Sequence, residues 1–250
     1  MNSIKYLFIV IFVFGLCKKS VAQVKKDTLR VLFVGNSYSF TSNMPHFISL
    51  LSDSTTTKLL TARSATGGAS LKDHWTHQKG LKTKKIIREG NYDIVVIQEH
   101  SMGTIDKKDD FLNYTKKLCD LAKASGAKPY LYVTWARQKV PQYQNIITEV
   151  YREAAEQNNC DLVLVGEAWE FARTLRPDVE LFKSDGSHPS HLGAFLTACV
   201  FVNALIPKVT QQLPNRNFMS VANREQLRLL MEDPLDIAFC MKVASGFSKR

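Results

Sequence analysis

The sequence lacks the patterns that most simply identify several classes of binding protein. Its five cysteines in 250 residues form no C-x-x-C pair, which argues against a zinc knuckle or a thioredoxin-type redox site. No zinc-finger, RNP or basic-zipper pattern accompanies the net charge of +10, so we expect no nucleic-acid partner. A G-x-G-x-x-G loop and a Walker lysine are also missing, which argues against a nucleotide-binding protein.

An apolar segment long enough to anchor the chain in a membrane is missing as well. The apolar run Tyr6–Cys17 has 12 residues, and as a helix it spans about 18 Å, against a hydrocarbon core of roughly 30 Å. Lys5 precedes this run and the small residues 20–22 follow it, which is typical of a cleaved signal peptide. We therefore predict a signal peptide at residues 1–22, a secreted or periplasmic protein, and no stable membrane insertion after cleavage.

Acidic residues are outnumbered, with 23 Asp and Glu against 33 Lys and Arg. The predicted signal peptide holds three of the lysines and no acidic residue, so the net charge of the remainder is +7. This excess is spread over separate short runs, which favours solvated faces over a nucleic-acid site and biases the surface towards acidic substrates. Lys249 and Arg250 end the chain, and we expect residues 236–250 to form a basic tail.

Four cysteines remain outside the predicted signal peptide. Export would permit disulfides, and the sequence leaves their pairing open. Cys119 and Cys199 lie in apolar-periodic stretches, so we expect them to pack as small hydrophobic residues.

Short apolar runs alternate with longer amphipathic segments along the chain. This alternation predicts an α/β fold, a three-layer α/β/α flavodoxin-like domain with a mostly parallel five-stranded sheet. The predicted strands are Leu29–Val34, Lys58–Ala62, Asp93–Gln98, Pro129–Thr134 and Asp161–Val165. The predicted helices are Pro45–Asp53, Leu71–Glu89 (as one helix or two), Asp109–Ser125, Pro141–Asn158, Pro189–Ala204 and Val221–Met231. No repeat or linker is visible, so we assign residues 23–235 to one domain.

Chemically capable residues follow several of the predicted strands. In a parallel sheet these positions meet at the carboxyl edge, where ligands bind. Ser37 follows the first strand through a turn at Gly35, and Asp185 precedes His188 by three residues. A serine hydroxyl needs a base within hydrogen-bond reach and a partner that orients the base. Alone, Ser37 is better explained as a turn or N-cap serine, and Asp185–Pro189 as an Asx turn before a helix. Together they supply the parts of a catalytic group in which Ser37 attacks, His188 accepts its proton and Asp185 orients His188.

Two blocks of the sequence resemble the SGNH (GDSL-like) hydrolase superfamily. Val34-Gly35-Asn36-Ser37 is similar to the family's first block, and Asp185-x-x-His188-Pro189-x-x-x-Gly193 to its last. The resemblance implies a hydrolase that uses Ser37, Asp185 and His188, with no metal and no organic cofactor. Gly35-x-Ser37-x-Ser39 lacks the final glycine of G-x-S-x-G, which argues against an α/β-hydrolase turn.

The same resemblance implies an oxyanion hole, which stabilises negative charge on the carbonyl oxygen in the transition state. Its donors would be the backbone amides of Ser37 and Gly68, with Gly67 as a close alternative. The family's third block usually supplies an asparagine side chain, and this sequence has none there. We predict that Gln98 takes its place.

The remaining histidines and tryptophans fit less specific roles. His74 and His77 are three residues apart, but without a third ligand they are better explained as surface or rim histidines than as zinc ligands. His100 lies close to the predicted site, and His191 is an alternative to His188 as the base. The three tryptophans could stack on sugars, although buried aromatic residues are commoner.

Together these observations predict an exported serine esterase that hydrolyses acetyl or short acyl esters, perhaps on carbohydrates. Its partners would be small-molecule or glycan ester substrates. The alternative is a catalytically weak or inactive SGNH-like domain that binds glycan, which the missing third-block asparagine favours.

Overall fold

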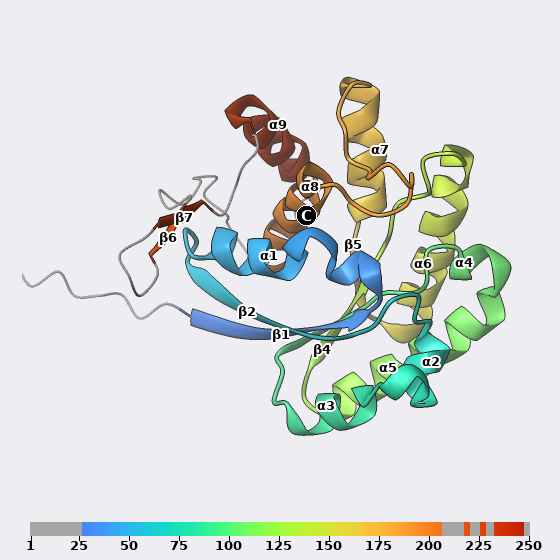
Figure 1. Ribbon diagram of the computed structural model, residues 1–250. Helices are drawn as coiled ribbons and strands as arrows, with labels where there is room; N and C mark the ends of the chain where they lie inside the picture. Colours follow the sequence, from blue (N-terminus) through green and yellow to red (C-terminus); the bar gives the residue numbers. More distant parts are fainter. Residues whose placement is uncertain (1–26, 207–217, 221–225, 229–232, 248–250) are drawn as a thin grey trace, which may run out of the picture.

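The central sheet matches the five strands predicted from the sequence (Figure 1). The computed structural model describes residues 27–206, 218–220, 226–228 and 233–247. The strands of the sheet are β1 (Asp27–Gly35), β2 (Thr57–Ala65), β3 (Ile94–Ile97), β4 (Lys128–Tyr132) and β5 (Asp161–Val163). The predicted signal peptide, residues 1–22, lies outside the described residues.

The strand order is β2-β1-β3-β4-β5, and all neighbouring pairs are parallel. This is the flavodoxin-like order, so the predicted fold class is confirmed and the sheet is wholly parallel. Strand β2 lies on one side of β1, and β3 and the later strands lie on the other, so the strand order reverses between β1 and β3. The carboxyl ends of β1 and β3 lie side by side. The residues that follow them therefore share one edge of the sheet.

Helices cover both faces of the sheet, and they include every predicted helix that falls within the described residues. Their bounds are α1 (Met44–Ser52), α2 (Leu71–Trp75), α3 (Thr83–Glu89), α4 (Gly103–Asp106), α5 (Lys108–Ala124), α6 (Gln144–Asn158), α7 (Val165–Leu175), α8 (His191–Leu205) and α9 (Pro234–Ser245). The predicted segment Leu71–Glu89 forms two helices, α2 and α3. Helix α7 was not predicted.

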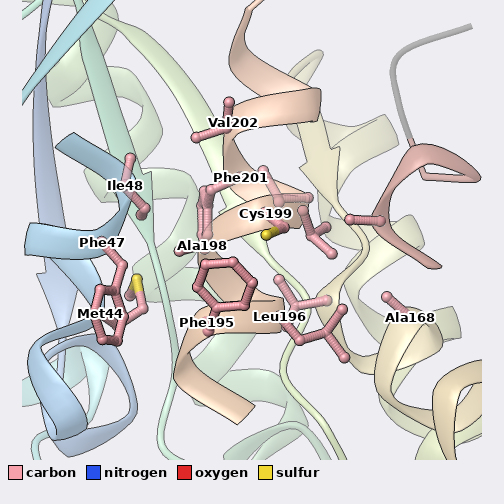
Figure 2. Close-up of a cluster of buried hydrophobic side chains, with 14 of the residues drawn as sticks. Met44, Phe47, Ile48, Ala168, Phe195, Leu196, Ala198, Cys199, Phe201 and Val202 are labelled. Atoms are coloured by element: carbon pink, nitrogen blue, oxygen red, sulfur yellow. The ribbon is translucent and has the colours of Figure 1, made fainter. Parts of the chain in front are cut away.

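Helices α1, α7, α8 and α9 lie on one side of the sheet (Figure 1). Helix α8 is apolar on all sides, and every residue from Leu192 to Leu205 is buried. Figure 2 shows its side chains between Met44, Phe47 and Ile48 of α1 and Ala168 of α7. A helix that is apolar all round must be covered on its outer side, and α9 supplies that cover.

The opposite face packs against α2, α3, α5 and α6. Alternate residues of β1 point to the two sides: Val31 and Phe33 join the first core, and Leu32 and Val34 join the second. Because the second half of β1 is buried on both faces, residues 31–34 form a continuous apolar run.

The predicted basic tail, residues 236–250, is wrong over most of its length. Helix α9 begins at Pro234, capped by Asp233, and buries Ile237, Cys240 and Val243. Lysines near its end masked this apolar face in the sequence, and the packed domain therefore extends past residue 235. The predicted helix Val221–Met231 lies largely outside the described residues; its described part, Gln226–Arg228, is strand β7, paired with β6 (Phe218–Ser220).

Among the described residues, no cysteine forms a disulfide. Cys119 and Cys199 are buried in the two cores, as the sequence predicted. Within the described residues, no helix combines the length and the apolar character that crossing a bilayer requires.

Candidate active site

Ser37, His188 and Asp185 form a continuous hydrogen-bonded row at the carboxyl edge of the sheet. The distance from Ser37 Oγ to His188 Nε2 is 2.8 Å, and the distance from His188 Nδ1 to Asp185 Oδ2 is 2.6 Å. Ser37 comes from the turn after β1, and the other two residues come from the loop before α8. The structure thus brings together residues about 150 positions apart in the sequence.

The Asp185 carboxylate is held by its own loop. Its Oδ1 accepts hydrogen bonds from the backbone N–H groups of Ser187 and His188, both at 2.9 Å. Desolvation opposes ionisation, but the His188 ring and these two amides lower the pKa of Asp185 to about 2. A carboxylate that stays ionised can hold the Nδ1 proton of His188, which leaves Nε2 to accept the proton of Ser37.

Asn36 fixes the turn that presents Ser37. Its side-chain oxygen accepts from Tyr38 N at 3.1 Å, which caps the short 3-10 helix Ser37–Ser39. Its side-chain nitrogen donates to Ala69 O at 3.0 Å and to Glu99 O at 3.4 Å. Asn36 therefore ties the Ser37 turn to the loops after β2 and β3.

Gln98 does not have the position that the sequence prediction gave it. It is fully buried, and its Oε1 accepts from Asn36 N at 3.0 Å and from Ser39 Oγ at 2.8 Å. Its amide nitrogen donates to the carbonyl oxygen of Glu99. Both ends of the side chain are thus occupied beneath the turn. Gln98 supports the Ser37 turn from below and, being fully buried, presents no donor at the surface of the site.

Gly35 is required by the same packing. A Cβ atom on Gly35 would lie 2.3 Å from Gln98 Oε1 and 2.4 Å from Ser39 Oγ. The backbone can therefore approach Gln98 only where there is no side chain.

Two predicted oxyanion donors are free to act. The backbone N–H groups of Ser37 and Gly68 have no hydrogen-bond partner among the described residues. Gly68 is exposed and has a φ of +61°, a left-handed conformation that glycine adopts without strain. Lys79 Nζ donates to the Gly68 carbonyl oxygen at 2.6 Å, which fixes the orientation of this peptide.

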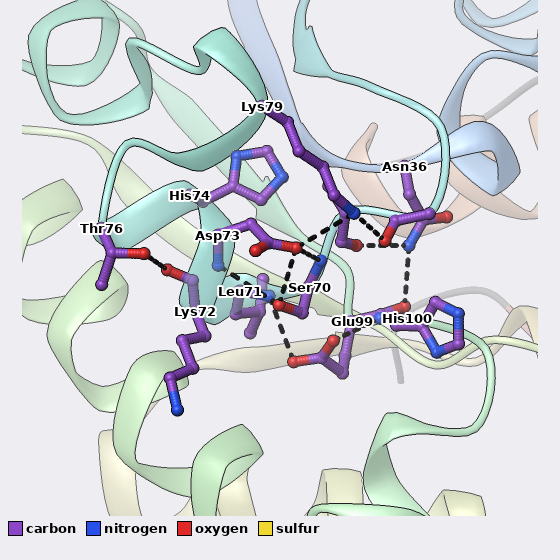
Figure 3. A network of polar contacts seen from close by, with 12 residues as sticks. Asn36, Ser70, Leu71, Lys72, Asp73, His74, Thr76, Lys79, Glu99 and His100 are labelled. Atoms are coloured by element: carbon purple, nitrogen blue, oxygen red, sulfur yellow. Dashed lines mark hydrogen bonds and ion pairs between the residues drawn. The ribbon is translucent and has the colours of Figure 1, made fainter.

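Glu99 was not identified from the sequence, and it lies in the network that joins the loops around the site (Figure 3). Its carboxylate accepts from the backbone N–H groups of Leu71, at 3.2 Å, and His100, at 2.5 Å. Burial raises the pKa of Glu99 to about 7, against the effect of these two hydrogen bonds. A single acidic residue after an apolar strand has no sequence signature, so only the fold identifies it.

His74 is fully buried, which corrects its prediction as a surface or rim histidine. Its Nε2 lies 2.9 Å from Gly35 O and its Nδ1 lies 2.7 Å from Thr83 Oγ1. Burial lowers the pKa of His74 to about 4, so the ring is neutral at pH 7. A carbonyl can only accept, so Nε2 carries the proton and Nδ1 accepts from Thr83. His74 thereby holds Gly35, at the start of the turn that presents Ser37.

Aromatic side chains form the wall beside His188. Tyr38 stacks on Trp135 with ring centroids 4.7 Å apart, and Trp135 stacks on Trp169 at 3.8 Å. Trp135 Nε1 donates to Ser187 O at 2.9 Å, and Tyr38 OH lies 2.6 Å from Ser187 Oγ. Trp135 and Trp169 are 2% and 1% exposed, so Trp135 holds the Asp185–His188 loop from inside and neither ring presents an open surface to a sugar.

The other predicted residues lie outside the hydrogen-bonded row. His191 is the first residue of α8 and is exposed, and His77 is an exposed residue after α2. His100 is partly buried and lines a cavity of about 480 Å³ that also contacts Gly68. Among the described residues, no group of three His, Cys, Asp or Glu side chains could hold a metal ion.

The chain is similar to solved structures, although no protein-family model and no curated protein sequence matches it. A protein of Slackia heliotrinireducens classed among the SGNH hydrolases is 27% identical, with a TM-score of 0.59, over 70% of this chain and 98% of that one. A DUF4886 family protein from Bacteroides uniformis is 19% identical, with a TM-score of 0.70, over 88% and 94% of the two chains. An acetyl xylan esterase is 17% identical, with a TM-score of 0.55, over 71% and 100%.

These neighbours confirm the resemblance to the SGNH (GDSL-like) hydrolase superfamily that the sequence predicted. At their low identities the second and third show the fold alone. The names among the neighbours support an ester hydrolase as the general class of this chain.

Proposed function

We propose that this chain is a serine esterase that hydrolyses carboxylic esters through an acyl-serine intermediate. The observation that carries the proposal is the row from Ser37 Oγ through the His188 ring to Asp185, with distances of 2.8 and 2.6 Å. If Ser37 only capped a turn, its hydroxyl would not require an imidazole beside it. If Asp185 only formed an Asx turn, the His188 ring would not have to lie within hydrogen-bond distance of a hydroxyl 151 positions away.

In the proposed reaction Ser37 Oγ attacks the ester carbonyl while His188 Nε2 takes the hydroxyl proton. The carbonyl oxygen becomes negatively charged and accepts hydrogen bonds from the amides of Ser37 and Gly68. His188 then returns the proton to the leaving alcohol, and the acyl group stays on Ser37. A water molecule, deprotonated by His188, releases the acid and restores the serine.

The oxyanion site then has two donors, the amides of Ser37 and Gly68, and lacks the third side-chain donor of the family pattern. Gln98 does not supply it, because its side chain is bonded to Asn36, Ser39 and Glu99 beneath the turn. Losing one such donor typically raises the barrier by about 2.7–4 kcal/mol. This observation favours the second candidate function, a weak or inactive domain that binds glycan. We rank it second, because a binding domain gives no physical reason for the row of Ser37, His188 and Asp185.

We propose acetyl or other short acyl esters as substrates, and export through the predicted signal peptide at residues 1–22. The acetyl xylan esterase among the structural neighbours supports an acetylated carbohydrate. The burial of Trp135 and Trp169 removes the argument from sugar stacking.

The test compares hydrolysis of p-nitrophenyl acetate, and acetate release from acetylated xylan, by the wild type and Ser37→Ala. We expect Ser37→Ala to lower kcat/KM by at least about 10³-fold, as removal of a nucleophile does. Ser245→Ala is the matched control, because its exposed hydroxyl contacts only its own helix. Equal rates for the wild type and Ser37→Ala would remove Ser37 from the mechanism, and retained xylan binding without hydrolysis would favour the glycan-binding function.

A further inference from the structure

Arg137 is a partly buried cation in the loop after β4, and it makes no ion pair with any described carboxylate. Its Nε and Nη2 atoms donate to Ser101 Oγ at 3.2 and 2.8 Å. A guanidinium has five N–H groups, so three of them, including both on Nη1, have no partner among the described residues. A partly desolvated guanidinium beside a neutral hydroxyl lacks the negative charge that normally stabilises it.

The position of Arg137 relates it to the proposed active site. The next residue, Gln138, donates its backbone N–H to Gly186 O at 2.8 Å, within the loop that carries Asp185 and His188. On its other side, Ser101 belongs to the loop after β3 and is buried. Arg137 therefore lies between two of the loops that form the carboxyl edge.

Most of the charges that act on the His100 ring are positive. Burial lowers the pKa of His100, and the charges of Arg137, Lys79 and Lys107 lower it further, while only Asp106 opposes them. His100 lines the cavity of about 480 Å³ that reaches Gly68, the proposed oxyanion residue. The lysines that line this cavity stand beside four acidic residues, and Lys79 and Lys72 pair with two of them. Arg137 lies outside this lining, its charge acts on His100, and it has no acidic partner among the described residues.

We propose that Arg137 binds a carboxylate on the substrate close to the scissile ester, so that esters carrying a carboxylate are preferred. This inference rests on the proposed esterase function and names its substrate class. The free Nη1 and Nη2 hydrogens form the planar fork that matches the two oxygens of a carboxylate. Ser101 holds the other edge of the guanidinium and so fixes the direction of the fork.

The test uses two acetyl esters of matched size, 4-acetoxybenzoate and its neutral counterpart 4-acetoxybenzamide. Acetate release is followed at constant pH 7 for the wild type, Arg137→Gln and Arg137→Lys, and each rate is corrected for the uncatalysed reaction. We expect the wild type to favour the carboxylate ester by roughly tenfold in kcat/KM, as for one charge-assisted contact. Arg137→Gln should bring the ratio close to one, and Arg137→Lys, which keeps the charge without the fork, should give an intermediate ratio.

Controls separate recognition from a structural effect. Arg88→Gln removes an exposed arginine on α3 and should keep the wild-type ratio. Ser101→Ala releases the guanidinium from its anchor and should lower the ratio while the charge remains. A wild-type ratio of one, or a folded Arg137→Gln that loses both rates equally, would overturn the inference.

A binding measurement keeps this inference distinct from the proposed function. Calorimetric titration of Ser37→Ala with 4-hydroxybenzoate and 4-hydroxybenzamide should show a preference for the carboxylate that Arg137→Gln abolishes. Carboxylate binding through Arg137 without any ester hydrolysis would contradict only the esterase. Hydrolysis of both esters with no dependence on Arg137 would contradict only the carboxylate preference.

Discussion

Among single residues, Asp185 is the most exposed member of the hydrogen-bonded row, and its contribution can be isolated by a small change. Asp185→Asn keeps the size of the side chain and removes the charge that holds the Nδ1 proton of His188. The asparagine amide can instead favour the tautomer that leaves no lone pair towards Ser37. We expect kcat for p-nitrophenyl acetate to fall by about 10²–10⁴-fold.

The exposed pair of Lys116 and Asp120 on α5 provides the matched control, because Asp120→Asn removes a carboxylate far from Ser37. An Asp185→Asn protein with the kcat of Asp120→Asn would show that Asp185 does not orient the base. Since the pKa of Asp185 is about 2, its protonation does not limit the rate above about pH 4.

His74 makes a prediction about stability and pH. Burial lowers its pKa from 6.5 to about 4, so between these values the unfolded chain binds a proton that the folded chain does not. The stability that neutral His74 supplies is complete above about pH 6.5, and it declines by up to about 1.4 kcal/mol per pH unit as the pH falls towards 4. We expect His74→Gln to be about 1–3 kcal/mol less stable at pH 7, with a smaller deficit at pH 5.

Urea unfolding of both proteins at pH 7.5, 6 and 5 measures this difference. Glu99 titrates in the opposite sense, because its raised pKa makes the folded chain bind the extra proton, but it is present in both proteins and cancels. A deficit independent of pH would mean that residue 74 is not a buried neutral imidazole.

The reacting residues could be predicted from the sequence, and their supports could not. Ser37, Asp185 and His188 lie in two short blocks that resemble the first and last blocks of a known family, and this resemblance, more than their spacing, predicted their roles. Gln98 and His74 owe their roles to contacts with residues about 60 and 39 positions away. Nothing beside them in the sequence indicates a buried side chain, so their predicted roles were wrong.

At the scale of secondary-structure elements, α9 distinguishes the packed domain from the predicted basic tail. Ile237 is 4% exposed against α8, and Leu235, two residues earlier, is 78% exposed. We expect Ile237→Ala to lower the free energy of unfolding by about 2–5 kcal/mol, as truncation of a buried isoleucine does. Leu235→Ala should change it by less than about 0.5 kcal/mol.

Chemical denaturation of the two variants provides the measurement. Equal and small changes would mean that residues 236–250 behave as an unpacked tail, as the sequence suggested. A large loss confined to Ile237→Ala would support the helix.

Strands β3 and β4 and the second half of β1 were predictable because each is a short apolar run that is buried along all or most of its length. Helix α7 was missed because it begins at Val165, two residues after β5, and the apolar run Leu162–Val165 continues across the boundary. Periodicity cannot divide such a run between a strand and a helix. Helix α9 was missed for another reason, because Lys249 and Arg250 at the end of the chain suggested a solvated tail.

For the whole molecule, one five-stranded sheet separates two hydrophobic cores. Buried residues of β1 belong to both cores, so neither core can lose its packing while the other stays intact. We expect a single cooperative urea transition, with the same midpoint by tryptophan fluorescence and by far-ultraviolet circular dichroism. Two separate midpoints would show that the α8–α9 layer unfolds on its own.

The account depends most directly on the reactivity of the Ser37 hydroxyl. A fluorophosphonate probe, followed by peptide mass spectrometry, measures whether that oxygen is activated, because phosphonylation requires a nucleophilic serine and the proton acceptor beside it. We predict one modified residue, Ser37, in the wild type, with labelling greatly slowed in His188→Gln and absent in Ser37→Ala. A folded wild-type protein that stays unlabelled, or is labelled at another serine, would contradict the proposed esterase.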